Sequence, residues 1–200
     1  MPSRTFHNLN KEKKMRILKA AKKEFSRVPL EKAVIANIAK DADIPRGSFY
    51  QYFTSLEDLY IYLINFLYGI DKKKFESYLE KNGNNIYDAI KDKFANEIDK
   101  LSKESNRQFK LNTLSILFSG NNIYSQEMIQ YVMDRHAQFD IDYFPPEMQQ
   151  HKNIDKFIDM VKAISDMFIK KYLAKEVTSS QVKTQYNNYI DFLKCNFGSL

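Results

Sequence analysis

Cysteine is almost absent from this 200-residue sequence, because Cys195 is the only one. A single thiol excludes an internal disulfide framework and is typical of a reducing compartment, so we expect a cytoplasmic protein. The first 16 residues are polar and lack the apolar centre of a secretion signal. No run of 18 apolar residues is present to span a membrane, and glycine and proline occur only five times each. Long periodic stretches of apolar residues fill the chain instead, which predicts an all-α fold.

Constellations of catalytic or metal-binding residues are also lacking. His7, His136 and His151 are far apart and have no acidic or cysteine partner at ligand spacing, so we expect no metal site and no cofactor. The sequence has neither a glycine loop for phosphate nor a nucleophile elbow. These absences indicate a protein that is not an enzyme.

Positive charge is in excess only in the first quarter of the chain. Residues 1–53 hold 12 Lys and Arg against 5 Asp and Glu, whereas the remaining residues hold 19 against 20. Charge that served solubility alone would be spread along the chain. Basic charge gathered in one segment is typical of a phosphate-bearing partner, so the pattern favours nucleic-acid binding.

The sequence from Ile38 to Phe53 predicts two short helices joined by a tight turn. Ile38, Ala39 and Ala42 form a narrow apolar stripe on the first helix, and Phe49 and Phe53 form the apolar face of the second. The other face of the second helix is rich in hydrogen-bond donors and has no carboxylate, which suits the major groove of DNA. On spacing alone, a plain helical hairpin fits equally well.

With the flanking sequences ILKAAKKEF (residues 17–25) and SLEDLY (residues 55–60), this stretch resembles the N-terminal DNA-binding domain of TetR-type (tetracycline-repressor-like) transcriptional regulators. The resemblance covers residues 11–66. It implies a three-helix helix-turn-helix DNA-binding domain over residues 1–54, joined to a larger helical bundle for ligand binding and dimerisation over residues 55–200. It further implies a ligand-responsive repressor that binds a palindromic DNA operator as a homodimer and is released by a small apolar or amphipathic effector.

The resemblance also implies which residues contact DNA. They are Arg46, Gly47, Ser48, Tyr50, Gln51, Tyr52 and Ser55. The sequence departs from the family pattern at three positions. Ala33 and Val34 stand where the family has a capping Thr or Ser, and Leu56 stands where a Lys is common. These departures motivate a second hypothesis, a helical interaction protein that keeps the fold and has lost operator binding.

Helical periodicity places the other elements. We expect a flexible arm before residue 11 and a loop over residues 138–150. Helices are predicted at 11–27, 56–79, 86–102, 107–118, 125–137, 153–175 and 179–200, and the second helix of the stretch described above is predicted at 45–52. We expect Asn10 to cap the helix at 11–27, and Ser55 with Asp58 to cap the helix at 56–79.

The predicted helix at 153–175 carries apolar residues in two rows, and the predicted helix at 179–200 carries them in one. The resembled family pairs these helices between subunits as a four-helix interface, although an intramolecular bundle would leave similar rows. The predicted interface residues are Ile158, Val161, Phe168, Tyr172, Tyr186, Tyr189 and Leu193.

The effector is expected among the middle helices, where aromatic and aliphatic residues are dense. The candidate ligand-binding residues are Phe66, Phe109, Leu117, Tyr124, Arg135 and His136. Arg135 and His136 are included because they suit a carboxylate, although such groups more often lie on the surface, and the apolar candidates are first of all core residues.

Overall fold

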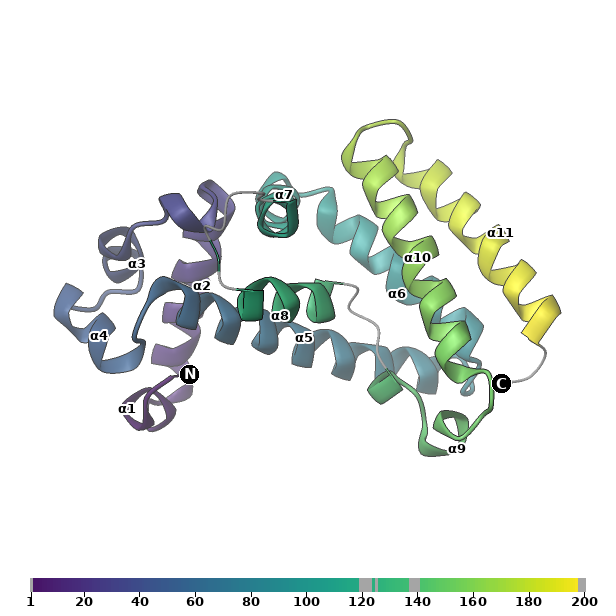
Figure 1. Cartoon of the computed structure of the whole chain (residues 1–200), viewed down its shortest axis with the longest axis horizontal. Coiled ribbons are helices and arrows are strands. Elements are labelled where there is room, and N and C mark those ends of the chain that lie inside the picture. The colour runs from purple at the N-terminus through teal and green to yellow at the C-terminus, as the bar shows by residue number, and fades with distance from the viewer. Residues whose placement is uncertain (1, 119–123, 125, 137–140, 198–200) are drawn as a thin grey trace. The chain divides into compact units, whose positions relative to one another are not determined.

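The computed structural model describes residues 2–118, 124, 126–136 and 141–197, apart from the side chains of residues 118, 133–136 and 142. Within these residues every regular element is a helix (Figure 1). The chain divides into two compact units. Unit 1 consists of Met1–Leu67 and Glu104–Arg135, and unit 2 consists of Tyr68–Lys103 and His136–Leu200. This division by packing is distinct from the functional boundary at residue 54, which stays a prediction.

Unit 1 is built around the helices of the predicted helix-turn-helix. Its elements are α1 (Arg4–His7), α2 (Lys11–Arg27), η1 (Leu30–Lys32), α3 (Ile35–Asp41), η2 (Arg46–Ser48), α4 (Phe49–Tyr52), the first part of α5 (Leu56–Lys81), α7 (Glu104–Phe118) and α8 (Gln126–His136). Ile17, Phe25, Ile38 and Phe49 are buried together in its core, as their spacing predicts.

Helix α2 begins and ends where the sequence predicts. The side chain of Asn10 accepts a hydrogen bond from the backbone N–H of Lys13 at 2.8 Å and so caps the first turn. At the other end Val28 is extended, with φ −142° and ψ 156°, because Pro29 disfavours helical geometry in the residue before it. Helix α7 packs along α2 within unit 1.

The segment before α2 differs from the sequence-based expectation. The prediction of a flexible arm is wrong for residues 3–9, because Arg4–His7 form the short helix α1 and Phe6 is completely buried. The segment has too little periodicity to predict a helix, but one aromatic residue fixes it to the core.

Unit 2 is a helical bundle formed by the last part of α5, α6 (Ile86–Leu101), η3 (Ile141–Tyr143), α9 (Pro146–Gln149), α10 (Ile154–Leu173) and α11 (Ser179–Phe197). Helices α6 and α11 are held together by the stacked rings of Phe94 and Tyr186, whose centroids lie 3.6 Å apart. The expected loop at 138–150 contains η3 and α9, where Tyr143 and Phe144 are buried. These elements are only three and four residues long and are separated by two adjacent prolines, so helical periodicity does not reveal them.

Among the described residues, none of the helices is both long enough and apolar enough to cross a membrane.

Candidate nucleic-acid interface

The turn between α3 and η2 fixes the direction in which the second helix leaves. The N–H of Asp43 donates to the carbonyl of Lys40 at 3.2 Å, and the N–H of Ile44 donates to that of Ala39 at 3.0 Å. This is the pair of bonds that closes a helix in a Schellman motif. Asp43 takes the left-handed position, with φ 54°, which Asp tolerates better than most side chains. Ile44 then returns to the core, 8% exposed, and anchors the turn.

The predicted helix over residues 45–52 is a 3-10 turn, η2, that continues into the single α-helical turn of α4. Phe49 and Phe53 are each 1% exposed and hold this segment against the core. Arg46, Gly47 and Gln51 are exposed on the opposite side, Ser48 is half-buried, and Tyr50 is 61% exposed. We call Arg46, Gly47, Ser48, Tyr50 and Gln51 the α4 surface.

Tyr52 does not share the α4 surface. It follows Phe49 by three positions on the helix, so both side chains point to the same buried face, and Tyr52 is only 4% exposed. Its ring lies against Phe6, with centroids 6.1 Å apart, and beneath the ammonium group of Lys13. We therefore remove Tyr52 from the proposed DNA contacts.

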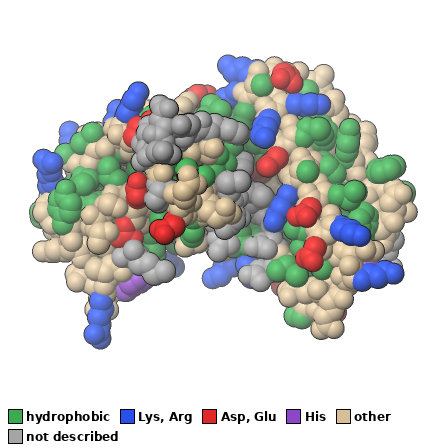
Figure 2. Space-filling model, viewed as in Figure 1, with side chains coloured by type: hydrophobic (Ala, Val, Ile, Leu, Met, Phe, Trp, Pro, Cys, Tyr) green, Lys and Arg blue, Asp and Glu red, His purple; other side chains and the backbone are tan. Residues whose placement is uncertain are grey.

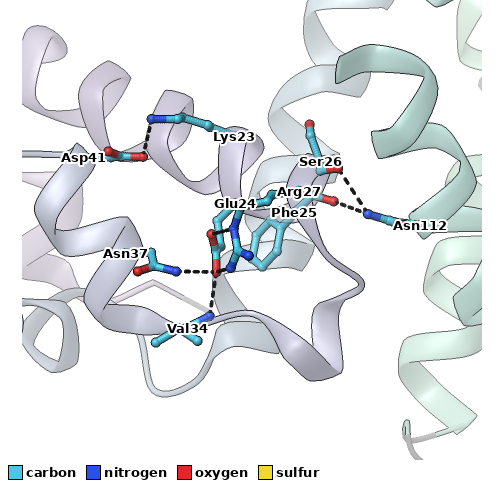
Figure 3. Close-up of polar contacts among 9 residues, drawn as sticks. All are labelled: Lys23, Glu24, Phe25, Ser26, Arg27, Val34, Asn37, Asp41 and Asn112. Carbon is cyan, nitrogen blue, oxygen red and sulfur yellow. Dashed lines mark hydrogen bonds and ion pairs between the residues drawn. The ribbon is translucent and has the colours of Figure 1, made fainter. Parts of the chain in front are cut away.

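The start of α3, which lacks a capping side chain of its own, receives a hydrogen-bond acceptor from another helix. Glu24 of α2 is 4% exposed, and its carboxylate accepts a hydrogen bond from the N–H of Val34 at 2.9 Å (Figure 3). The Asn37 amide donates to it at 3.1 Å, and the Arg27 guanidinium donates to both of its oxygens at 2.9 and 2.7 Å. A carboxylate at a helix N-terminus also interacts favourably with the helix dipole.

These donors explain the acidity of Glu24. The hydrogen bonds from Arg27 are the largest cause and lower the pKa of the carboxyl below its ordinary value of 4.5, with smaller contributions from Val34 and Asn37. Burial raises the pKa and opposes them only in part. The carboxylate is therefore charged at neutral pH and holds α2 against the start of α3, the helix that precedes the turn.

Helix α5 begins with the predicted capping arrangement. The hydroxyl of Ser55 accepts from the N–H of Asp58 at 3.1 Å, and the carboxylate of Asp58 accepts from the N–H of Thr54 at 3.1 Å. Ser55 is exposed beside these groups. Leu56 is half-buried and packs against the core, so it fills space at the position where the family commonly has a lysine.

Comparison with known proteins agrees with this geometry. Residues 17–63 match the family model of the bacterial regulatory proteins of the tetR family. Residues 17–63 are therefore similar to the N-terminal domain of that family.

A curated protein that is similar to part of this chain is the uncharacterised HTH-type transcriptional regulator YdgC of Bacillus subtilis (strain 168). It is 39% identical over 80 residues, and the match spans 40% of this chain and 41% of the relative. A TetR-family regulator structure from a Rhodococcus species covers 92% of this chain and 98% of its own, with 15% identity and a TM-score of 0.67. The structure of the transcriptional regulator FadR of Bacillus subtilis, solved in complex with stearoyl-CoA, covers 88% of this chain and 97% of its own, with 15% identity and a TM-score of 0.63. These neighbours are transcriptional regulators.

Four of the six candidate ligand residues lie in or against the core of unit 1. Phe66, Phe109 and Leu117 are half-buried against it, and Tyr124 is 6% exposed. Tyr124 donates its hydroxyl to the carboxylate of Glu31. The side chains of Arg135 and His136 lie outside the described residues. The role of these residues toward a ligand stays a prediction.

The predicted interface residues divide between two environments. Ile158, Val161, Phe168, Tyr186 and Leu193 are each between 1% and 4% exposed, because they form the core that α10 and α11 share within unit 2. Their side chains are occupied within the chain and are unavailable to a partner, so the intramolecular alternative accounts for that row. Tyr172 is half-buried, and Tyr189 is 48% exposed.

Other apolar side chains of these two helices face outward. Met160 is 47% exposed and Phe192 is 67% exposed, and Figure 2 shows hydrophobic side chains gathered among charged ones over α10 and α11. We call Met160, Tyr189 and Phe192 the α10/α11 surface. Both rows of α10 contribute to the core, because Ile158 belongs to one row and the buried Phe157 to the other, and Met160 is the exposed member of the second row.

Across the described residues, no three His, Cys, Asp or Glu side chains are grouped so that they could hold a metal ion.

Proposed function

We propose that this protein is a transcriptional regulator that binds double-stranded DNA through the α4 surface. The observation that carries the proposal is a helix-turn-helix whose second helix buries Phe49 and Phe53 and exposes Arg46, Tyr50 and Gln51. Guanidinium and amide groups hydrogen-bond base edges and phosphates, and the tyrosine ring suits thymine methyl groups. The excess of basic residues over 1–53 supports the same assignment.

The proposed regulator acts as a homodimer on a palindromic operator. One short recognition helix reads few base pairs, so helix-turn-helix proteins usually pair two copies about one helical turn apart. The α10/α11 surface supports this pairing, because large apolar side chains exposed together favour a protein partner. A small apolar or amphipathic effector, bound among the aromatic helices, releases the repressor by favouring a second conformer.

The DNA assignment is tested with a mobility-shift assay on the DNA that flanks the protein's own gene. Replacing both Tyr50 and Gln51 by Ala removes two exposed contacts and is expected to weaken binding at least tenfold. The matched control replaces both Gln126 and Glu127 by Ala. These residues are exposed in the first turn of α8, so this variant is expected to bind like the wild type. Equal binding by the Tyr50/Gln51 variant and the wild type would refute the α4 surface.

The same assay separates the alternative of an interaction protein without operator binding. Ala33, Val34 and Leu56 motivate that alternative, since each removes an expected polar contact. Failure of the wild type to bind any duplex at low ionic strength, where phosphate contacts are strongest, favours the alternative over the repressor.

The dimer is tested by sedimentation of Phe192→Glu. Placing a carboxylate on the α10/α11 surface is expected to convert dimer to monomer while the helical circular-dichroism signal is retained. The control is Thr184→Glu, an exposed position elsewhere on α11, which is expected to sediment as the wild type does. A wild-type protein that is monomeric at micromolar concentration contradicts the dimer.

A further inference from the structure

The short helix α4 has an unusual problem at its C-terminal end. It is only four residues long, and Phe53 leaves it in extended geometry with φ −134° and ψ 143°. The carbonyls of its last turn therefore have no donors within the helix. Because the α4 surface is carried by this one turn, whatever satisfies these carbonyls also fixes the direction of the proposed DNA contacts.

Ser3, from the N-terminal end of the chain, supplies donors to two of these carbonyls. Its N–H donates to the carbonyl of Tyr52 at 2.9 Å, and its hydroxyl donates to the carbonyl of Gln51 at 2.5 Å. The same hydroxyl accepts from the N–H of Phe6 at 3.2 Å and caps α1. One residue thus ends α4 and begins α1.

Phe6 anchors this arrangement. It is 0% exposed, and its ring centroid lies 4.7 Å from that of Phe53 and 5.1 Å from that of Tyr62. These rings come from the residue after α4 and from α5, so Phe6 fills the space between the recognition segment and the helix that follows it. The ammonium of Lys14 also donates to the carbonyl of His7 at 2.7 Å and ties the end of α1 to α2.

We propose that Ser3 and Phe6 are positioning residues for DNA recognition, and that residues 3–8 act as a clasp that holds α4 in its reading orientation. The proposal rests on the proposed function of the α4 surface, and it adds to that surface a segment outside the helix-turn-helix. Neither residue contacts DNA in this account. Each acts through α4, by ending it with two hydrogen bonds and by packing beneath it.

The clasp is tested with three variants of the full chain. Ser3→Pro removes the N–H and the hydroxyl, and its fixed φ matches the −67° of Ser3, so the backbone itself is not strained. Ser3→Thr keeps both donors and serves as the conservative rescue. Phe6→Ala removes the anchor independently, and Thr5→Ala, at an exposed position of α1, is the control.

Two measurements are made on each variant. Hydrogen exchange of the free protein reports the order of residues 49–53, and fluorescence anisotropy reports affinity for a duplex that the wild type selects from a random library. Ser3→Pro and Phe6→Ala are expected to speed exchange of residues 49–53 at least tenfold, with α7 unchanged, and to weaken DNA binding about tenfold. Ser3→Thr and Thr5→Ala are expected to match the wild type in both.

The outcomes separate the clasp from the proposed function. Exchange over residues 49–53 that stays at the wild-type rate in both Ser3→Pro and Phe6→Ala overturns the clasp. Faster exchange in a protein whose wild type selects no duplex supports the clasp and refutes the DNA-binding proposal. Faster exchange with unchanged DNA affinity overturns the positioning role.

Discussion

Glu24 is a single buried carboxylate that links α2 to the start of the helix-turn-helix. Its partners are Arg27 on its own helix and Val34 and Asn37 at the start of α3 (Figure 3). A carboxylate that accepts several hydrogen bonds stabilises the fold only while it is charged, since the donors otherwise lose their acceptor. The pH dependence of stability should therefore identify it.

We predict that Glu24→Gln lowers the free energy of unfolding by about 1 to 3 kcal/mol at neutral pH, the usual range for hydrogen bonds to a buried charge. The pKa of Glu24 is lowered in the folded state, so its contribution is present above 4.5 and is lost as the pH falls through the folded-state value. The difference between wild type and variant should shrink on acidification, as measured by urea unfolding at several pH values.

The control for this prediction is Glu12→Gln, an exposed glutamate on the same helix. It is expected to change the free energy of unfolding by less than about 0.5 kcal/mol at any of these pH values. A Glu24→Gln penalty that stays constant from neutral to acidic pH would show that the carboxylate acts by shape and not by charge.

Residue roles were predictable where a position and its neighbours in sequence decide them. Asn10 and Ser55 were recognised as caps because an N-cap acts on backbone only two or three residues away. Glu24 lies ten residues from Val34, and Ser3 lies 48 from Gln51, so their contacts exist only once the helices pack. The uncapped start of α3 was visible in the sequence, but its solution was not.

Helices α2 and α7 are joined by hydrogen bonds from a side chain of α7 to backbone carbonyls at the end of α2. Because Val28 leaves helical geometry and Pro29 has no N–H, the carbonyls of the last turn of α2 lack helical donors. The side-chain amide of Asn112 donates to the carbonyl of Phe25 at 2.9 Å and to that of Ser26 at 3.4 Å (Figure 3). Asn112 is 7% exposed, so water does not replace it easily.

We predict that Asn112→Ala lowers the free energy of unfolding by about 1 to 3 kcal/mol, because it leaves buried carbonyls without a donor. The control is Asn188→Ala, at an exposed position of α11, which should change the free energy of unfolding by less than about 0.5 kcal/mol. Denaturant unfolding followed by circular dichroism measures both. Equal effects of the two substitutions would remove Asn112 as a determinant of α2–α7 packing.

Element boundaries were the most predictable level. Helix α2 was predicted over its full observed range, α6 and α10 within two residues at each end, and α11 begins at the predicted residue, because long apolar periodicities define them. Short elements were missed or simplified. Helix α1, the 3-10 turn η2, and η3 with α9 are too short for a period to appear, and single buried aromatic residues such as Phe6 and Tyr143 hold them in place.

At the scale of the whole molecule, the charge distribution and the α10/α11 surface both fit a protein that binds DNA as a pair of copies. The basic residues of 1–53 give each copy an attraction for phosphate, and pairing of two copies doubles the number of contacts on one duplex. The predicted interface residues lie on the same two helices as this surface, but most of them are buried within unit 2. Packing within unit 2 consumes that row and leaves Tyr189, Phe192 and Met160 for a second copy.

A salt titration of DNA affinity tests the homodimer and the α4 surface together. Each phosphate contact contributes about 0.9 to the slope of log affinity against log salt concentration. Arg46 is exposed on the α4 surface, so Arg46→Ala should reduce the slope by about 2 if two copies bind one operator, and by about 1 if a single copy binds. Lys170→Ala, at an exposed cation of α10 in unit 2, should leave the slope unchanged.

In the monomeric Phe192→Glu variant, the reduction of the slope caused by Arg46→Ala should fall from about 2 to about 1, since only one α4 surface then binds the duplex. A slope that does not respond to Arg46→Ala in either background would place the phosphate contacts elsewhere on the basic segment.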